Sequence, residues 1–153
     1  MRDLPGVKRV LRLRAVTGRP SAAIPTFLAL TEWDMRHATK GSLEPREHAD
    51  GVVLTHLLAS DDVSLQRVQF DPGTGVEEHS HHQEQLGFVF SGTQTIVTPD
   101  ETVHVAAGES YAIDPHEPHA VENRGDEPLE AVSCFSPPRQ HAPWEHEDGD
   151  REA

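Results

Sequence analysis

Three histidines in two separate stretches have the type and the spacing to bind a metal ion. His79 and His81 lie in the stretch GTGVEEHSHHQEQLGFVFSG, and His119 lies in the later stretch GESYAIDPHEPHAVEN. Alternate side chains of an extended strand point to the same face. On such a strand His79, His81 and Gln85 have the same parity, so two imidazoles and an amide oxygen would point the same way. His119 is our candidate for completing the site.

Three imidazoles and one oxygen ligand suit divalent Fe, Mn, Co, Ni, Cu or Zn. On a six-coordinate ion these four ligands leave two positions for water or for two ligand oxygens. Gln85 is neutral and leaves the charge of the metal uncancelled, which strengthens its action as a Lewis acid. Because imidazoles bind metals only when neutral, we expect metal affinity to fall as the pH drops through about 6.5.

The fourth ligand has a rival in Glu84, which directly precedes Gln85. A regular strand would point the Glu84 side chain away from His79 and His81, but a bulge near His82 would reverse this. We favour Gln85, and the alternative stays open.

A proton-transfer group is also expected near the metal. Glu77 shares the parity of His79 and is our candidate catalytic acid or base. Three further residues are weaker candidates. His104 could point into the site, Tyr111 could donate a hydrogen bond to a bound anion, and Arg67 could clamp a carboxylate.

The two stretches resemble the two motifs of the cupin superfamily. The first motif reads Gly, five residues, His-x-His, three or four residues, Glu, six residues, Gly. The second reads Gly, five residues, Pro-x-Gly, two residues, His, three residues, Asn. The motif residues present at the right spacing are Gly73, His79, His81, Gly92, Gly108, His119 and Asn123. The chain departs from the motifs at Gln85, in place of Glu, and at Asp114 and His116, in place of Pro and Gly.

This resemblance implies an all-β cupin fold, a double-stranded β-helix or jelly-roll barrel, with the metal held by His79, His81, Gln85 and His119. The arrangement HSHHQEQ is similar to that of small single-domain cupins of pectin and alginate breakdown. It implies ring opening or tautomerisation of unsaturated uronates, a small carboxylate or sugar acid as ligand, and a homodimer. Iron-dependent dioxygenation, ligand binding without turnover and a metal-free barrel are the alternatives.

The segments that carry these residues are predicted to be short strands. Nine runs rich in branched or alternating apolar residues are separated by turn signals such as Asp71-Pro72-Gly73, with no convincing helix between them. Short strands at this spacing are typical of a sandwich or barrel. We expect them at residues 51–58, 63–70, 76–81, 85–90, 94–98, 102–106, 109–113, 119–122 and 129–135.

The chain divides into a leader, a single barrel domain and a tail. Residues 1–34 carry six Arg and Lys against three Asp and Glu, and we expect them to be disordered or to come from a mis-annotated start, with Met35 as the true start. Pro25 interrupts the apolar stretch that a secretory signal would need. Residues 35–138 form the barrel, and residues 139–153 form an acidic tail.

Composition excludes several classes of protein. The net charge of −13 argues against a nucleic-acid partner, and no apolar run is long enough to cross a membrane. One cysteine, Cys134, cannot form an internal disulfide, so we expect a cytoplasmic protein. High acid content with eleven Arg and only two Lys resembles proteins of salt-loving organisms. A halophilic protein is therefore predicted, with simple solubility as the alternative.

Overall fold

The computed structural model describes the backbone of residues 7–13 and 32–139, and side chains from residue 35 onward. Its contacts divide the chain into two units, residues 1–42 and 43–153, and each is described by itself. In the first unit β1 (Val7–Leu13) pairs antiparallel with β2 (Glu32–Ala38), and the short 3-10 helix η1 (Lys40–Ser42) follows.

The hairpin spans the predicted boundary between the leader and the barrel. The predicted boundary at residue 34 falls inside β2, whereas the contacts divide the chain after Ser42. β1 was not among the strands predicted from the sequence. A leader that is disordered or wrongly included stays a prediction, and the acidic tail beyond Arg139 lies outside the described residues. Within the described ranges, no helix is long and apolar enough to span a membrane.

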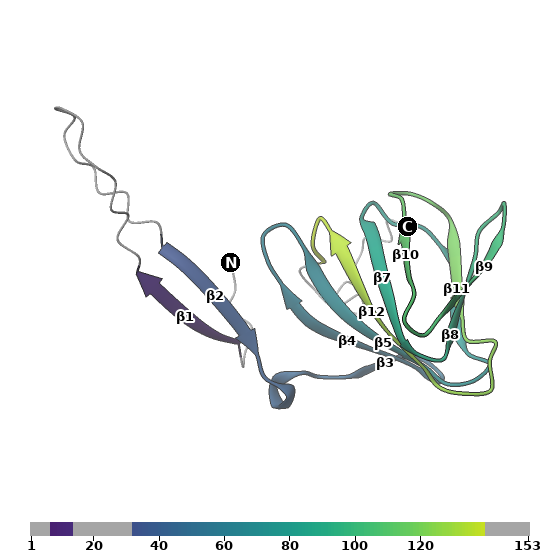
Figure 1. Cartoon of the computed structure of the whole chain (residues 1–153), viewed down its shortest axis with the longest axis horizontal. Coiled ribbons are helices and arrows are strands. Elements are labelled where there is room, and N and C mark those ends of the chain that lie inside the picture. Colours follow the sequence, from purple (N-terminus) through teal and green to yellow (C-terminus); the bar gives the residue numbers. More distant parts are fainter. Residues whose placement is uncertain (1–6, 14–31, 140–153) are drawn as a thin grey trace. The chain divides into compact units, whose positions relative to one another are not determined.

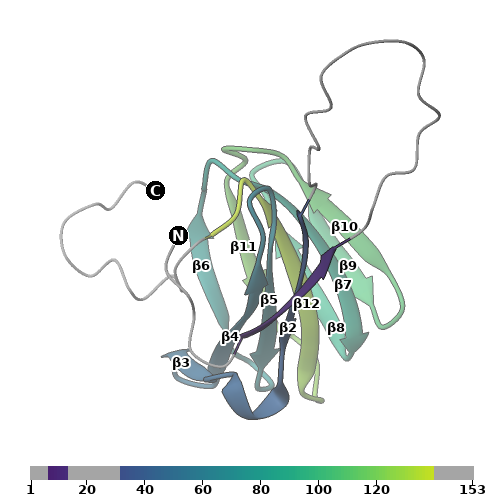
Figure 2. The ribbon, with the colours of Figure 1, turned by 90° about the vertical axis from the view of Figure 1, so that its left-hand side faces the viewer.

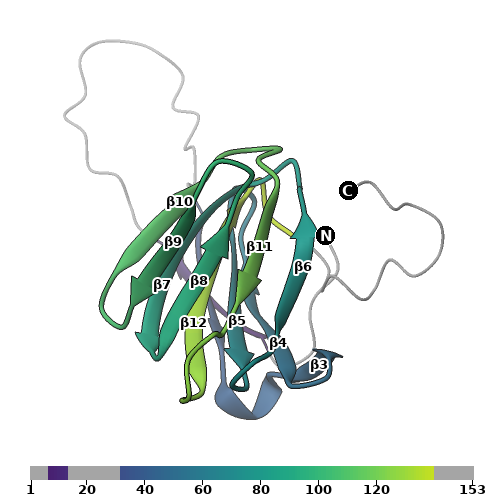
Figure 3. The same cartoon turned by 90° about the vertical axis from the view of Figure 1, so that its right-hand side faces the viewer.

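The second unit consists of two antiparallel sheets (Figure 1). The larger sheet, toward the viewer in Figure 2, has the strand order β10-β7-β12-β5-β4-β3. Its strands are β3 (Arg46–Ala49), β4 (Val52–Ala59), β5 (Ser64–Phe70), β7 (Glu84–Ser91), β10 (Ser110–Ile113) and β12 (Leu129–Ser136). The smaller sheet, in front in Figure 3, has the order β6-β11-β8-β9. Its strands are β6 (Gly75–His79), β8 (Thr93–Val97), β9 (Thr102–Ala106) and β11 (His119–Glu122).

The all-β fold class is confirmed, and all nine predicted strands are present with ends that agree within two residues. β3 was missed because its four residues, REHA, are all exposed and show no alternation of apolar and polar side chains. Its partner β4 supplies the apolar face of this edge.

The core lies between the two sheets, where alternate side chains of each strand meet. In β5 the buried positions are Ser64, Gln66, Val68 and Phe70, and the positions between them are less buried. β7 shows the same alternation. Burial of these apolar side chains supplies the main driving force that closes the two sheets on each other.

Two motif residues fix the chain before and after β11 (His119–Glu122). His116 stands where the cupin motif has Gly, and its φ of 66° shows why Gly is usual there. Its backbone N–H donates to the carbonyl of His81 over 2.7 Å, so the two motif stretches are joined directly. Asn123 is fully buried and donates through Nδ2 to the carbonyls of Phe70 and Glu127. Asn123 therefore has a structural role and takes no part in the chemistry of the site.

Candidate metal centre

The histidines of the two motifs converge from the smaller sheet and the connection that follows it, and Gln85 joins them from the larger sheet. His79 ends β6 and His119 begins β11, where the two residues are direct cross-strand partners. His81 lies in the connection to β7, and Gln85 is the second residue of β7 in the other sheet. The expectation of one continuous strand is therefore wrong, because the chain crosses between the sheets at residues 80–83. The residues predicted from strand parity nevertheless meet.

Each of the three imidazoles is fixed by a backbone carbonyl close to it in sequence. His79 Nδ1 lies 2.8 Å from the Glu77 carbonyl, His81 Nδ1 lies 2.9 Å from the Gln83 carbonyl, and His119 Nδ1 lies 2.7 Å from the Glu117 carbonyl. A carbonyl only accepts, so Nδ1 carries the proton in each ring. The neutral ring then has a bare lone pair on Nε2.

These three rings form a metal-binding arrangement. One ring nitrogen from each histidine lies within 4.8 Å of the others. His119 is 1% exposed, and its Nε2 has no hydrogen-bond partner among the described residues. Buried polar atoms without partners are rare in folded proteins. Three convergent lone pairs, one of them buried without a partner, can hold a divalent metal, as proteins use imidazole nitrogen for Zn, Cu, Fe and Ni.

Gln85 brings an oxygen to the same point. Its Oε1 lies 3.0 Å from His81 Nε2, and Gln85 is 6% exposed. With the His81 proton on Nδ1, both atoms are acceptors, and two lone pairs repel at this distance unless a cation lies beside them. Two neighbouring ligands with metal bonds of about 2.1 Å are themselves about 3 Å apart. Gln85 as the fourth ligand stays a prediction, and its position fits that part.

A hydrogen-bond network orients the Gln85 amide. Its Nε2 donates to Tyr111 Oη over 3.1 Å and to Ser133 Oγ over 3.2 Å. Tyr111 Oη also accepts from Gln94 Nε2 over 3.0 Å and lies 3.3 Å from Ser133 Oγ. A Cβ at Gly87 would overlap the Tyr111 ring, so this glycine makes room for the network. Both Gln85 amide hydrogens are used, which leaves the carbonyl oxygen facing His81.

The cavity lowers the basicity of two of the histidines. Burial lowers the pKa of His81 to about 4, and the positive charge of Arg139 adds to this effect. Burial also lowers the pKa of His79, with smaller contributions from His119 and Arg139. Both rings therefore keep the neutral form, which metal binding requires, to a lower pH than an ordinary imidazole does.

The site opens into a cavity of about 440 Å³, a size typical of small-molecule sites. Four buried glutamines, Gln66, Gln83, Gln85 and Gln94, contribute to its wall, together with the three histidines, Tyr111, Ser133, Phe135 and Arg139. None of the described residues that line it is Asp or Glu, although the chain contains 26 of these residues. The cavity thus differs in charge from the rest of the protein.

Several residues predicted for the site lie elsewhere. Glu84 is exposed at the start of β7, beside the inward-facing Gln85. Glu77 is exposed and absent from the cavity lining, and its contribution is the carbonyl that orients His79. Its expected role as catalytic acid or base stays a prediction without support from its position. Arg67 pairs instead with Glu130 across β5 and β12, with Nη2 2.8 Å from the carboxylate.

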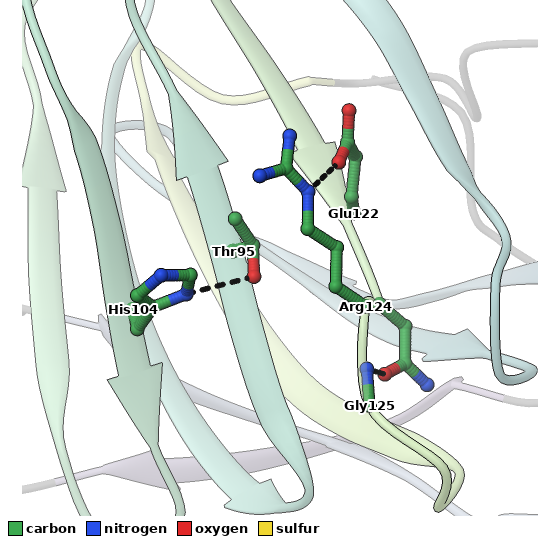
Figure 4. Close-up of polar contacts among 6 residues, drawn as sticks. Thr95, His104, Glu122, Arg124 and Gly125 are labelled. Carbon is green, nitrogen blue, oxygen red and sulfur yellow. Dashed lines mark hydrogen bonds and ion pairs between the residues drawn. The ribbon is translucent and has the colours of Figure 1, made fainter.

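His104 also lies outside the cavity. Its Nδ1 lies 3.1 Å from Thr95 Oγ1, between the neighbouring strands β9 and β8. Figure 4 shows this contact together with the Arg124–Glu122 ion pair near the same sheet. Thr95 sits between Gln94 and Ile96 in β8, and it is Gln94 that lines the cavity. The His104 side chain is exposed and takes no part in the metal centre.

Sequence reasoning missed Arg139, Gln94 and Ser133. Arg139 was assigned to the acidic tail, yet it follows the last strand and lines the cavity. A signal was present, because Arg139 is a cation placed three residues after the last strand of an acidic domain. Gln94 and Ser133 gave no signal, since a polar residue on a short strand is ordinarily taken to face solvent.

Comparison with known proteins agrees with this fold and site. Residues 66–135 match the family model of the Cupin domain. An RmlC-like cupin from Shewanella frigidimarina has a TM-score of 0.61 at 20% identity, over 67% of this chain and 91% of its own. KdgF from Halomonas sp. has a TM-score of 0.60 at 19% identity, over 67% of this chain and 93% of its own. H2HPP isomerase of Bacillus subtilis is 37% identical over 62 residues, 40% of this chain and 26% of that protein.

The barrel therefore contains a match to the Cupin domain and has the cupin fold, built as two antiparallel sheets around a site that can hold a metal.

Removal of a ligand imidazole should release the metal without unfolding the barrel. We expect His119→Ala to lower metal affinity at least tenfold, because the ring supplies one of three convergent lone pairs. Elemental analysis after dialysis measures the bound metal, and circular dichroism measures the fold. His104→Ala is the matched control and should keep its metal. Full metal content in His119→Ala would contradict the site.

The lowered pKa of His81 predicts a pH dependence of the stability of metal-free protein. The unfolded state takes up a proton at His81 as the pH falls below 6.5, whereas the folded state does so only near pH 4. The free energy of unfolding should therefore fall between pH 6.5 and pH 4 and then level off. Denaturant titrations of wild type and His81→Gln measure this, and the variant should show the smaller slope. Equal slopes would show that the ring is not buried as described.

Proposed function

We propose that this cupin binds a small carboxylate, such as a sugar acid, between its metal centre and Arg139. The observation that carries the proposal is the charge of the cavity. Among the described lining residues Arg139 has the only permanent charge, and no carboxylate lies beside it. Gln85 is neutral where the cupin motif has Glu, so a bound metal would keep its full charge. Such a cavity favours an anion over a cation or a neutral molecule.

Arg139 is held close to the histidines by an aromatic ring. Its guanidinium carbon lies 3.9 Å from the centroid of Phe135, whose ring meets His81 edge to face at 5.6 Å. Within the described part of the chain the guanidinium has no ion pair or hydrogen bond. Burial lowers the pKa of Arg139 to about 10, so the group is still positive at neutral pH. A partly desolvated cation without an anion is a suitable partner for a ligand carboxylate.

We further propose an isomerase-like or lyase-like reaction, the ring opening or tautomerisation of an unsaturated uronate. When bound, the metal supplies Lewis acidity toward a ligand oxygen. The chain's own residues would orient the carboxylate at Arg139 and move a proton from one ligand atom to another, so that no oxidant is consumed. Glu77 lies outside the cavity, whereas His48, His82 and Tyr111 line it and carry groups able to exchange protons. The similarity to a protein named as an isomerase supports this reaction class.

A second candidate function is binding without turnover. The absence of Asp and Glu from the described cavity lining favours it, because these are common proton-transfer groups in enzymes. The two candidates share the same ligand and differ only in whether the ligand is converted.

The carboxylate site is tested by removing the charge of Arg139. We expect Arg139→Gln to weaken binding of galacturonate by about 10- to 100-fold, the usual effect of losing a charged hydrogen bond. Isothermal titration calorimetry of metal-loaded protein measures the affinity. Arg67→Gln is the matched control and should bind like wild type, because Arg67 pairs with Glu130 outside the cavity. Equal affinities of the two variants would contradict the proposal.

Turnover is tested with protein loaded separately with each divalent metal. Loss of the ultraviolet absorbance of an unsaturated uronate without oxygen consumption would support the isomerase-like reaction. Oxygen consumption that occurs only when the protein is loaded with iron would instead show a dioxygenase. Saturable binding with neither signal would leave the binding function.

A homodimer is the assembly we propose, with a second copy covering the outer face of β7. Leu86, Phe88 and Phe90 point outward there and are 40–57% exposed, and the two phenylalanine rings lie 5.0 Å apart. Exposed apolar stripes of this kind often mark interfaces, and a symmetric pair would cover both copies. Light scattering should give twice the chain mass for wild type and for the control Val103→Glu, and a monomer for Phe90→Glu. A monomeric wild type would contradict this assembly.

Cytoplasmic location and adaptation to high salt also stay predictions.

A further inference from the structure

Two buried side-chain atoms in the cavity wall lack a hydrogen-bond partner among the described residues. They are Nε2 of His119 and Oε1 of Gln94. The metal centre accounts for the first atom. Nothing in the described protein accounts for the second, although Gln94 is only 3% exposed. An unpaired buried carbonyl oxygen is unfavourable, because it has lost its hydrogen bonds to water, so we expect a partner from outside the protein.

The network behind Gln94 fixes which end of its amide faces the cavity. Gln94 Nε2 donates to Tyr111 Oη, which also accepts from Gln85 Nε2. With both lone pairs of the tyrosine oxygen filled, Ser133 Oγ, 3.3 Å away, is the partner left for its own hydrogen. Tyr111 therefore has no hydrogen left for Gln94, and Gln94 Oε1 stays an acceptor that needs a donor.

The charge of the cavity limits what that donor can be. Arg139 and a bound divalent metal would repel an ammonium group, which leaves a neutral donor. An alcohol O–H is the neutral donor that a small acid most often carries. The neighbouring carboxamides of Gln66 and Gln83 give the wall further neutral polar groups of the same kind.

We propose that Gln94 is a specificity-determining residue that accepts a hydrogen bond from a hydroxyl group of the bound acid. This proposal rests on the proposed function and narrows its ligand to hydroxylated carboxylates. The same Tyr111 hydroxyl contacts both Gln85 and Gln94, so one network positions the predicted metal ligand and the hydroxyl acceptor together. A ligand without the hydroxyl leaves Gln94 Oε1 buried and unpaired, which selects against it.

The test compares galacturonate with its 2-deoxy, 3-deoxy and 4-deoxy analogues, using calorimetry on metal-loaded protein. Wild type should bind at least one analogue about 10-fold or more weakly than galacturonate, as expected for an unpaired buried acceptor. Gln94→Met should bind galacturonate and that one analogue with similar affinity. Its preferences for the other hydroxyl groups should stay as in wild type. Gln94→Glu keeps an acceptor oxygen, so it should keep the preference even though its charge weakens all binding. Gln69→Met, on the outward side of β5, is the matched control and should behave like wild type.

Each outcome decides between the two proposals. If wild type binds the acids through Arg139 but Gln94→Met keeps every preference, the assignment of Gln94 is overturned while the carboxylate site stands. The same holds if wild type shows no preference among the analogues, since a water molecule would then satisfy Gln94 Oε1. If wild type binds none of these acids, the proposed function fails and this assignment fails with it. Bound metal and circular dichroism of each variant show that a lost preference does not come from a lost fold.

Discussion

The structure depends on how three imidazole rings are held. Each ring donates from Nδ1 to a backbone carbonyl two residues away, so the strand ends and the connection that carry the rings also fix their tautomer. Three bare Nε2 atoms then face one point inside the barrel. This arrangement is unfavourable by itself, because lone pairs repel and the His119 nitrogen is buried without a partner. A cation would remove both costs, which is why the site is best understood as a metal centre.

The cavity around this metal centre carries a positive charge, whereas the chain as a whole is strongly negative. A chain of net charge −13 keeps its carboxylates out of the described cavity lining and places Arg139 and four glutamines there. Glutamine provides donors and acceptors without charge, so it can orient a ligand and leave the attraction between the metal, Arg139 and an anion intact. The replacement of the motif Glu by Gln85 belongs to the same pattern.

Much of this could be predicted from the sequence, and the reasons are physical. Strand alternation and turn residues located nine strands, because burial on one face of a sheet imposes a period of two on the side chains. The spacing of His79, His81 and His119 predicted the cluster, although the assumed single strand is two elements joined by a crossing. β3 and the β1–β2 hairpin were missed, since REHA and the basic leader lack that period.

The cavity wall could not be predicted in the same way. Arg67 and Arg139 are the same residue type, and only the tertiary fold shows that Arg67 pairs with Glu130 on the outer face while Arg139 stacks on Phe135 beside the histidines. Glu77 shares the parity of His79 but lies at an exposed position in the middle of its strand. The inward positions of Gln94 and Ser133 depend on hydrogen-bond partners more than fifteen residues away in the sequence, so local pattern could not predict them.

X-ray absorption spectroscopy of the zinc-loaded protein tests the central claim most directly, since it reports the atoms around the ion. The account predicts three imidazole nitrogens and at least one oxygen in the first shell, with the outer-shell scattering that imidazole rings produce. A first shell of oxygens alone, or one with fewer than three imidazoles, would show that these rings do not share one ion.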